Sequence, residues 1–170
     1  MEIDRIDTIL LGELATNGRT SQADLADRVG LSSTAVARRQ RALEANGFIR
    51  GYQAMLDLKR FGLGTTVLVR IILESQRGEA LKAFEVGVVS CPSVVRCFLM
   101  SGSDDYIVIA LARDIEDFER LHRTELSRLP RVARIESSFA LREVVDRAIP
   151  PVIFSKPRRS TSVRASVAND

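Results

Sequence analysis

The stretch SQADLADRVGLSSTAVARRQRALEANG, residues 21–47, carries several helix start and stop signals in close succession. Ser21, with an acid three residues later, resembles the capping box that begins a helix. Gly30 can take the left-handed conformation that ends a helix, and Ser32 is a good N-cap for the helix that follows. A short helix, a turn with glycine and a longer helix predict a helix-turn-helix.

The longer helix has two distinct faces. Projected at about 100° per residue, Val36 and Leu43 share the inner face, whereas Thr34, Arg38 and Arg41 lie outward. Hydroxyls at the N-terminus and arginines on the outer face suit a helix that enters the major groove of DNA. The alternative is a solvated surface, because arginine is a good helix former. The cap and the glycine turn before the helix favour DNA.

Two residues of this helix do not fit a simple outer face. Arg39 projects toward the edge of the inner face, where it could contact a carboxylate, a phosphate or both. Gln40 points largely inward and needs a hydrogen-bond partner, because an unsatisfied buried amide is costly. The residues predicted to contact DNA are Ser32, Ser33, Thr34, Arg38, Arg39 and Arg41.

Composition excludes several other classes of protein. The chain has 170 residues, is 45% apolar and 28% charged, and lacks an apolar run of the roughly 20 residues that cross a bilayer. Cys91, Cys97 and His122 are its only cysteines and histidine, too few and too far apart for a zinc site. Neither a phosphate-binding loop nor a nucleophile elbow is present. We therefore expect no enzyme and no cofactor, and a cytoplasmic location on the nucleoid without membrane attachment.

The net charge of +3 is unevenly spread. Residues 61–153 are close to neutral, whereas residues 154–170 hold four basic side chains and one acidic one. Residues 151–170 are expected to form a basic, disordered tail that adds nonspecific attraction for DNA.

A second domain is predicted after a hinge. Residues 1–50 form the helix-turn-helix domain, residues 51–64 a strand and hinge linker with a short strand at Ile49–Leu56, and residues 65–150 a second domain. There, strand and helix patterns alternate in the order βαββαβ, which is the ferredoxin-like arrangement. The fold class is therefore α+β, with an N-terminal winged-helix-like domain and a C-terminal ferredoxin-like domain.

The chain resembles the Lrp/AsnC family, the leucine-responsive or feast/famine regulators, over about residues 2–150. The resemblance rests on IDRIDTILLGELATNGRTSQADLADRVGLSSTAVARRQRALEANGFIRGYQAMLD, FEVGVVSCPSVVRCFLMSGSDDYIVIAL and LPRVARIESSFALREV, in that order. It implies a transcription regulator that binds double-stranded DNA, pairs sheet to sheet into dimers and assembles further into tetramers or octamers.

The resemblance also implies a small-molecule effector, commonly an amino acid, near a Gly-x-x-Asp turn. Carried over to this chain, effector contact falls on Met100, Gly102, Asp104, Asp105, Tyr106 and Ser137. A plain hairpin turn is the alternative reading of the same residues.

Three residues depart from the family pattern. Ser103 stands where an acid is common, Asp104 where an aromatic or apolar residue is usual, and Gln40 where the recognition helix usually has an aliphatic residue. An alternative function that the altered turn permits is that of an architectural protein, which bridges DNA with little sequence preference and without an effector. A metabolite-binding protein or enzyme with a vestigial helix-turn-helix is a further alternative, against which the missing catalytic constellation argues.

Overall fold

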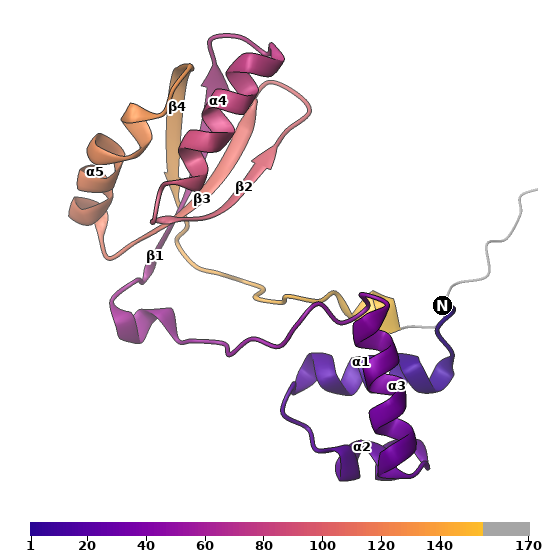
Figure 1. Ribbon diagram of the computed structural model, residues 1–170. Coiled ribbons are helices and arrows are strands. Elements are labelled where there is room, and N and C mark those ends of the chain that lie inside the picture. Colours follow the sequence, from indigo (N-terminus) through magenta and orange to yellow (C-terminus); the bar gives the residue numbers. More distant parts are fainter. Residues whose placement is uncertain (155–170) are drawn as a thin grey trace, which may run out of the picture. The chain divides into compact units, whose positions relative to one another are not determined.

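The computed structural model describes residues 1–154 (Figure 1). They form two compact units: Met1–Met55 together with residues 146–154, and Leu56–Val145. Within the described residues, no helix is both long and apolar enough to cross a membrane.

The first unit is built from three helices, α1 (Arg5–Thr16), α2 (Gln22–Val29) and α3 (Ser33–Ala45). Each begins at an N-cap side chain that accepts a hydrogen bond from a backbone amide two or three residues into the helix. Their apolar faces meet in one core, which contains Leu10, Leu14, Leu25, Ala26 and Val36.

The turn between α2 and α3 confirms the predicted helix-turn-helix. Gly30 has φ 68° and ψ 37°, the left-handed conformation that a side chain with a Cβ disfavours. The Leu31 amide then donates to the Ala26 carbonyl at 3.1 Å, and Ser32 caps α3. The predicted caps at Ser21 and Ser32 are both confirmed.

The strand predicted at Ile49–Leu56 is wrong. These residues form neither helix nor strand, and the chain next forms a 3-10 helix at Leu58–Phe61. Apolar and aromatic residues favour a strand, but a strand needs a neighbour with which to exchange backbone hydrogen bonds. The four-stranded sheet of this chain is formed by later residues only.

The second unit is a four-stranded antiparallel sheet with two helices on one face (Figure 1). Its elements are β1 (Thr65–Leu73), α4 (Gly78–Val89), β2 (Val94–Leu99), β3 (Tyr106–Ala112), α5 (Ile115–Thr124) and β4 (Val132–Phe139). The strand order β2-β3-β1-β4 and the chain order βαββαβ confirm the ferredoxin-like prediction.

Alternation along the two central strands separates a buried face from an open one. Val69 lies opposite Val108 and Ile71 opposite Tyr106, all four buried between the sheet and the helices. Leu68 and its neighbours in register point to the other face, where Leu68 is 40% exposed. Both helices of this unit, α4 and α5, lie on the buried face (Figure 1).

The buried face of α5 begins after its first residue. Ile115, with which the helix starts, is 70% exposed, whereas Phe118 and Leu121 are buried.

The segment expected to begin a disordered tail is partly ordered. Pro151–Phe154 form a 3-10 helix, and the Phe154 ring lies 3.7 Å from the position of a Cβ added to Gly12 of α1. Apolar packing therefore holds residues 151–154 on the first unit. The rest of the predicted tail, residues 155–170, lies outside the described residues.

Candidate nucleic-acid interface and effector site

The N-terminus of α3 presents hydroxyl groups to solvent. Ser32, Ser33 and Thr34 are all exposed. The Ser32 Oγ accepts from the Ala35 amide at 3.2 Å, which fixes the helix start. A helix N-terminus with unpaired amides and a partial positive charge favours a phosphate group.

Arg38 and Arg41 lie on the outer face of α3 and are exposed. Among residues 1–154, neither forms an ion pair or a side-chain hydrogen bond. An arginine presents five N–H donors in a planar fork that matches a guanine edge or a phosphate. Both arginines are therefore available to a nucleic acid without breaking a contact in the protein.

Arg39 is bound within the protein. Its Nη1 lies 2.7 Å from Asp4 Oδ2 and 2.8 Å from Asp7 Oδ1, so the predicted carboxylate partner is confirmed. Asp4 and Asp7 also form the capping box of α1, in which each carboxylate accepts the other residue's amide. The Asp7 amide and the Arg39 guanidinium together hold the pKa of Asp4 below its ordinary value.

This arrangement gives Arg39 a structural role. The side chain of Asp7 is only 4% exposed, and Arg39 supplies the charge that compensates it. The Arg39 side chain is 28% exposed, and phosphate contact by Arg39 stays a prediction.

Gln40 finds the partners that its inward position requires. Its Nε2 donates to Tyr52 Oη at 2.6 Å and to Glu44 Oε1 at 3.2 Å. Its Oε1 accepts from Gln22 Nε2 on α2. The prediction that this amide has hydrogen-bond partners is confirmed. The partners lie on α2, on α3 and in the segment after α3.

The turn between β2 and β3 forms the candidate effector site. The Met100 amide donates to the Asp105 carbonyl at 2.9 Å, which closes residues 100–105 into a loop. Gly102 has φ 130°, in the region that favours glycine, and no atom lies within 4 Å of the Cβ position there. Met100 and Gly102 are exposed and Asp104 is half-buried, so these three can meet a small molecule.

The other two residues of the turn are used within the protein. Asp105 is 6% exposed and accepts from the Leu73 amide at 2.7 Å and from Gln76 Nε2 at 2.8 Å. The Tyr106 hydroxyl donates to Glu85 Oε1 at 2.9 Å, and its ring packs on Phe84. Burial and Glu85 raise the pKa of Tyr106. Each polar group thus has a partner within the chain, and effector contact by these two residues stays a prediction.

Ser137 is not brought to this turn. It lies on β4 opposite Val69, whereas the turn extends from β2, and these strands form opposite edges of the sheet. The turn also leads into β3, which lies two strand spacings, about 10 Å, from β4. Effector contact by Ser137 stays a prediction.

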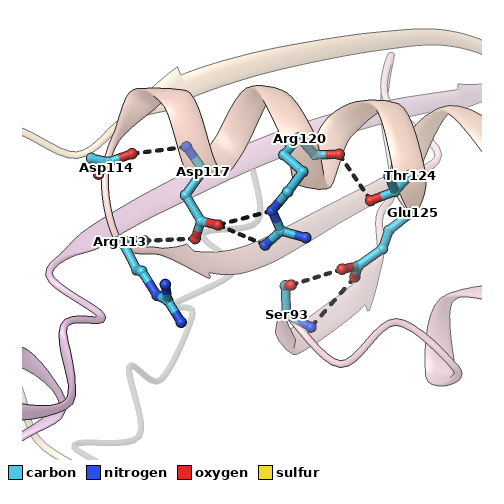
Figure 2. Close-up of polar contacts among 7 residues, drawn as sticks. All are labelled: Ser93, Arg113, Asp114, Asp117, Arg120, Thr124 and Glu125. Atoms are coloured by element: carbon cyan, nitrogen blue, oxygen red, sulfur yellow. Dashed lines mark hydrogen bonds and ion pairs between the residues drawn. The ribbon is translucent and has the colours of Figure 1, made fainter.

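A shallow hollow of about 370 Å³ lies along α5, and several of the charged groups that line it are paired with one another. Asp117 accepts from the Arg113 amide at 3.0 Å and from Arg120 Nη2 at 2.6 Å (Figure 2). Glu125, at the end of the same helix, accepts from Ser93 Oγ at 3.0 Å (Figure 2). The contacts of Asp117 and Glu125 join α5 to the residues next to β3 and β2.

The cysteines and the histidine form no reactive group. Burial raises the pKa of both Cys91 and Cys97, which favours the unreactive thiol. His122 lies edge-on to Phe118, with ring centroids 6.1 Å apart. In residues 1–154, no three His, Cys, Asp or Glu side chains are placed to hold a metal ion.

Sequence reasoning missed the partners that hold α3. Asp4 and Asp7, three residues apart at a helix start, are a visible capping signal, but nothing local pairs them with Arg39. Tyr52 and Gln22 had no such signal, because their contacts with Gln40 join distant parts of the chain.

Comparisons with known proteins cover nearly all of the described residues. Residues 3–50 match a family of winged helix-turn-helix DNA-binding domains, and residues 66–150 match the Lrp/AsnC ligand binding domain. The Bkd operon transcriptional regulator of Pseudomonas aeruginosa is 42% identical over 151 residues, which is 89% of this chain and 99% of that protein. The Leucine-responsive regulatory protein of Rhizobium meliloti is 33% identical over 146 residues, 86% of this chain and 94% of that protein.

Solved structures show the same architecture. A transcriptional regulator of Neisseria meningitidis in complex with L-Met superposes with a TM-score of 0.83 at 30% identity, covering 88% of this chain and 97% of that one. A regulator from Agrobacterium tumefaciens gives a TM-score of 0.83 at 31% identity, over 88% of this chain and 97% of that one.

Proposed function

The chain belongs to the Lrp/AsnC family of transcriptional regulators, and on that premise we propose that it binds specific DNA sites through α3 and responds to an amino acid or a related metabolite. It is a regulator with a ligand-binding domain, not an enzyme. Sequence preference, the oligomer and the effector are the parts that need experiment.

The unpartnered outer face of α3 carries the proposal of sequence-specific binding. Arg38 and Arg41 have no ion pair among residues 1–154, although the neighbouring Arg39 has two. Base edges in the major groove distinguish all four base pairs, and an arginine that contacts guanine discriminates by about 1–3 kcal/mol. Exposed hydroxyls at Ser33 and Thr34 supply the phosphate contacts that fix the register.

A homodimer would place two such helices on one DNA site. The open face of the sheet supports this, because Leu68 and Phe98 are 40% and 46% exposed there and lie beside half-buried isoleucines of β3. A second copy packed on this face would cover them. Two-fold pairing would set the helices one turn of DNA apart, about 34 Å.

The oligomer is tested by sedimentation equilibrium. Phe98→Asp should shift the chain toward the monomer, because a carboxylate cannot be buried in an apolar interface without a partner. Val89→Asp, at an 84% exposed position on α4, is the matched control and should keep the wild-type mass. A Phe98→Asp chain that keeps the wild-type mass would place the interface elsewhere.

The effector would bind at the turn of residues 100–105. Met100 offers an apolar surface, Gly102 allows close approach of the backbone, and the Asp104 carboxylate can pair with an ammonium group. Bound L-Met in the Neisseria structure and the name of the leucine-responsive relative make L-methionine and L-leucine the first probes. An effector that binds one state of the oligomer better would shift its DNA affinity.

Selection from a random duplex pool tests the proposed function. At about 0.2 M salt, counterion competition suppresses nonspecific binding, so recovered duplexes report base recognition. We expect a pseudo-palindromic site. Recovery of no enriched sequence, with binding lost between low and moderate salt, would instead support an architectural protein.

Calorimetry then tests the effector on the wild-type chain and on Asp104→Ala. L-methionine or L-leucine should bind the wild-type chain and bind Asp104→Ala more weakly. Equal binding by both would remove Asp104 from the site.

A further inference from the structure

A closed set of hydrogen bonds joins α3 to the segment that follows it. Tyr52 lies beyond the end of α3, where the chain forms neither helix nor strand. Its Oη accepts from Gln40 Nε2 at 2.6 Å and donates to Glu44 Oε1 at 2.8 Å. Gln40 Nε2 also donates to Glu44 Oε1 at 3.2 Å, so the three side chains form a triangle.

The triangle continues to α2. Gln40 Oε1 accepts from Gln22 Nε2, so both polar atoms of Gln40 are engaged. One side chain therefore connects the two helices of the helix-turn-helix with the segment after it. Gln40 lies between Arg39 and Arg41 in the sequence, next to the face proposed to read DNA.

The ring of Tyr52 is held by contacts at its edges rather than by burial. A Cβ added to Gly18, in the turn between α1 and α2, would lie 3.3 Å from Tyr52 Cδ1. The side chain is nonetheless 50% exposed. Because half of Tyr52 stays exposed, its two hydrogen bonds add to a partial burial in fixing where the ring lies.

We infer that Tyr52 is a positioning residue for DNA recognition: acting through Gln40 and Glu44, it fixes α3 against α2 and makes the setting of α3 depend on the segment after it. This inference rests on the proposed function, since it takes α3 as the helix that reads DNA. Movement of the segment would withdraw Tyr52 and leave Gln40 with only its bonds to Glu44 and Gln22, which hold α3 less firmly. The core residues Val36 and Leu43 would keep the helix folded.

Such a release would affect base recognition more than general DNA binding. Hydrogen bonds to base edges need a fixed helix position, whereas phosphate attraction tolerates small displacements. The expected signature is a loss of preference between a selected site and a scrambled one, with little change in affinity for the scrambled site.

The chain supplies a control for the experiment. Tyr52→Phe removes the hydroxyl bonded to Gln40 and Glu44, and Thr65→Val removes a hydroxyl that donates to the Arg113 carbonyl in the other unit. Each full-length variant is titrated with the selected duplex and with a scrambled duplex of equal length at about 0.2 M salt. Tyr52→Phe should lower the ratio of the two affinities about threefold or more, the effect of losing at least one hydrogen bond, and Thr65→Val should leave it unchanged.

A double-mutant cycle tests whether Tyr52 acts through Gln40. Gln40→Met keeps the length and helix preference of the side chain while removing its hydrogen bonds. Tyr52→Phe should cause less additional loss in the Gln40→Met chain than in the wild-type chain, because the two residues act as a unit. Fully additive losses would overturn the route through Gln40.

Two other results would overturn the positioning role. One is a Tyr52→Phe chain with the wild-type ratio, and the other is an equal loss on both duplexes. A wild-type chain that prefers neither duplex would overturn the proposed function and this inference together. A wild-type preference that Tyr52→Phe keeps in full would overturn this inference alone.

Discussion

The outer face of α3 and the turn between β2 and β3 both carry residues predicted to touch a ligand, but they use their charged groups differently. Arg38 and Arg41 have no partner among residues 1–154, whereas Asp105 has two donors and Tyr106 has an acceptor. A charged group left free on an ordered helix is available to a target, while one with its hydrogen bonds made inside the chain supports the fold. Residue type alone does not distinguish these cases.

The largest effect is expected at Asp105, whose hydrogen bonds are made inside the chain. Asp105→Ala leaves the Leu73 amide buried without an acceptor and frees Gln76, which should lower the free energy of unfolding by about 2–3 kcal/mol. Urea unfolding measures the change. Asp104→Ala is the matched control and should cost less than about 0.5 kcal/mol. Equal stability of the two variants would show that the buried carboxylate does not support the turn.

The next largest effect is expected at Arg38, one of the two arginines of α3 that have no partner among residues 1–154. Arg38→Ala should weaken binding to the selected site by about 1–3 kcal/mol if the guanidinium reads a base, with no loss of folding stability. Titration with the selected and the scrambled duplex separates base reading from phosphate contact, since a phosphate contact affects both. Unchanged affinity for the selected site would remove Arg38 from the interface.

Arg39 sharpens the comparison, because it lies beside the free arginines and yet is paired. Arg39→Met should lower the free energy of unfolding by about 1–2 kcal/mol, since Asp7 would stay buried without its cation. Arg41→Met is the control on the exposed face and should unfold like the wild-type chain. A loss of DNA binding without a loss of stability in Arg39→Met would contradict the structural role.

The smallest effect is a pH dependence of the α1 cap. The pKa of Asp4 is lowered from its ordinary 3.8 by the Asp7 amide and Arg39. Because this pKa is lowered in the folded chain, the ionised Asp4 carboxylate stabilises the fold. This contribution is complete above pH 3.8 and is lost as the pH falls through the lowered value. Thermal unfolding from pH 5 to pH 3 should show a smaller decline for Asp4→Asn than for the wild-type chain. The same decline in both would assign the acid sensitivity to other carboxylates.

Part of this molecule followed from local sequence rules. The caps at Ser21 and Ser32 and the left-handed Gly30 were predictable because each acts within four residues of its own position. Strand and helix patterns likewise predicted the order βαββαβ of the second unit. The strand pattern read at Ile49–Leu56 was misleading, because it cannot show whether a neighbouring strand exists.

The sequence by itself therefore determined the two domains, their element order, the exposed arginine face and the family. Only the tertiary structure decided which charged residues are free. Arg39 meets Asp4 and Asp7 across more than thirty residues of chain, and Asp105 meets Leu73 across the sheet. A hydrogen bond forms when two groups come within about 3 Å in the right direction, and packing between distant segments sets that distance. The hydrogen bond between Gln40 and Tyr52 likewise depends on how separate segments pack. The residues that hold α3 in place could therefore be identified only in the folded chain.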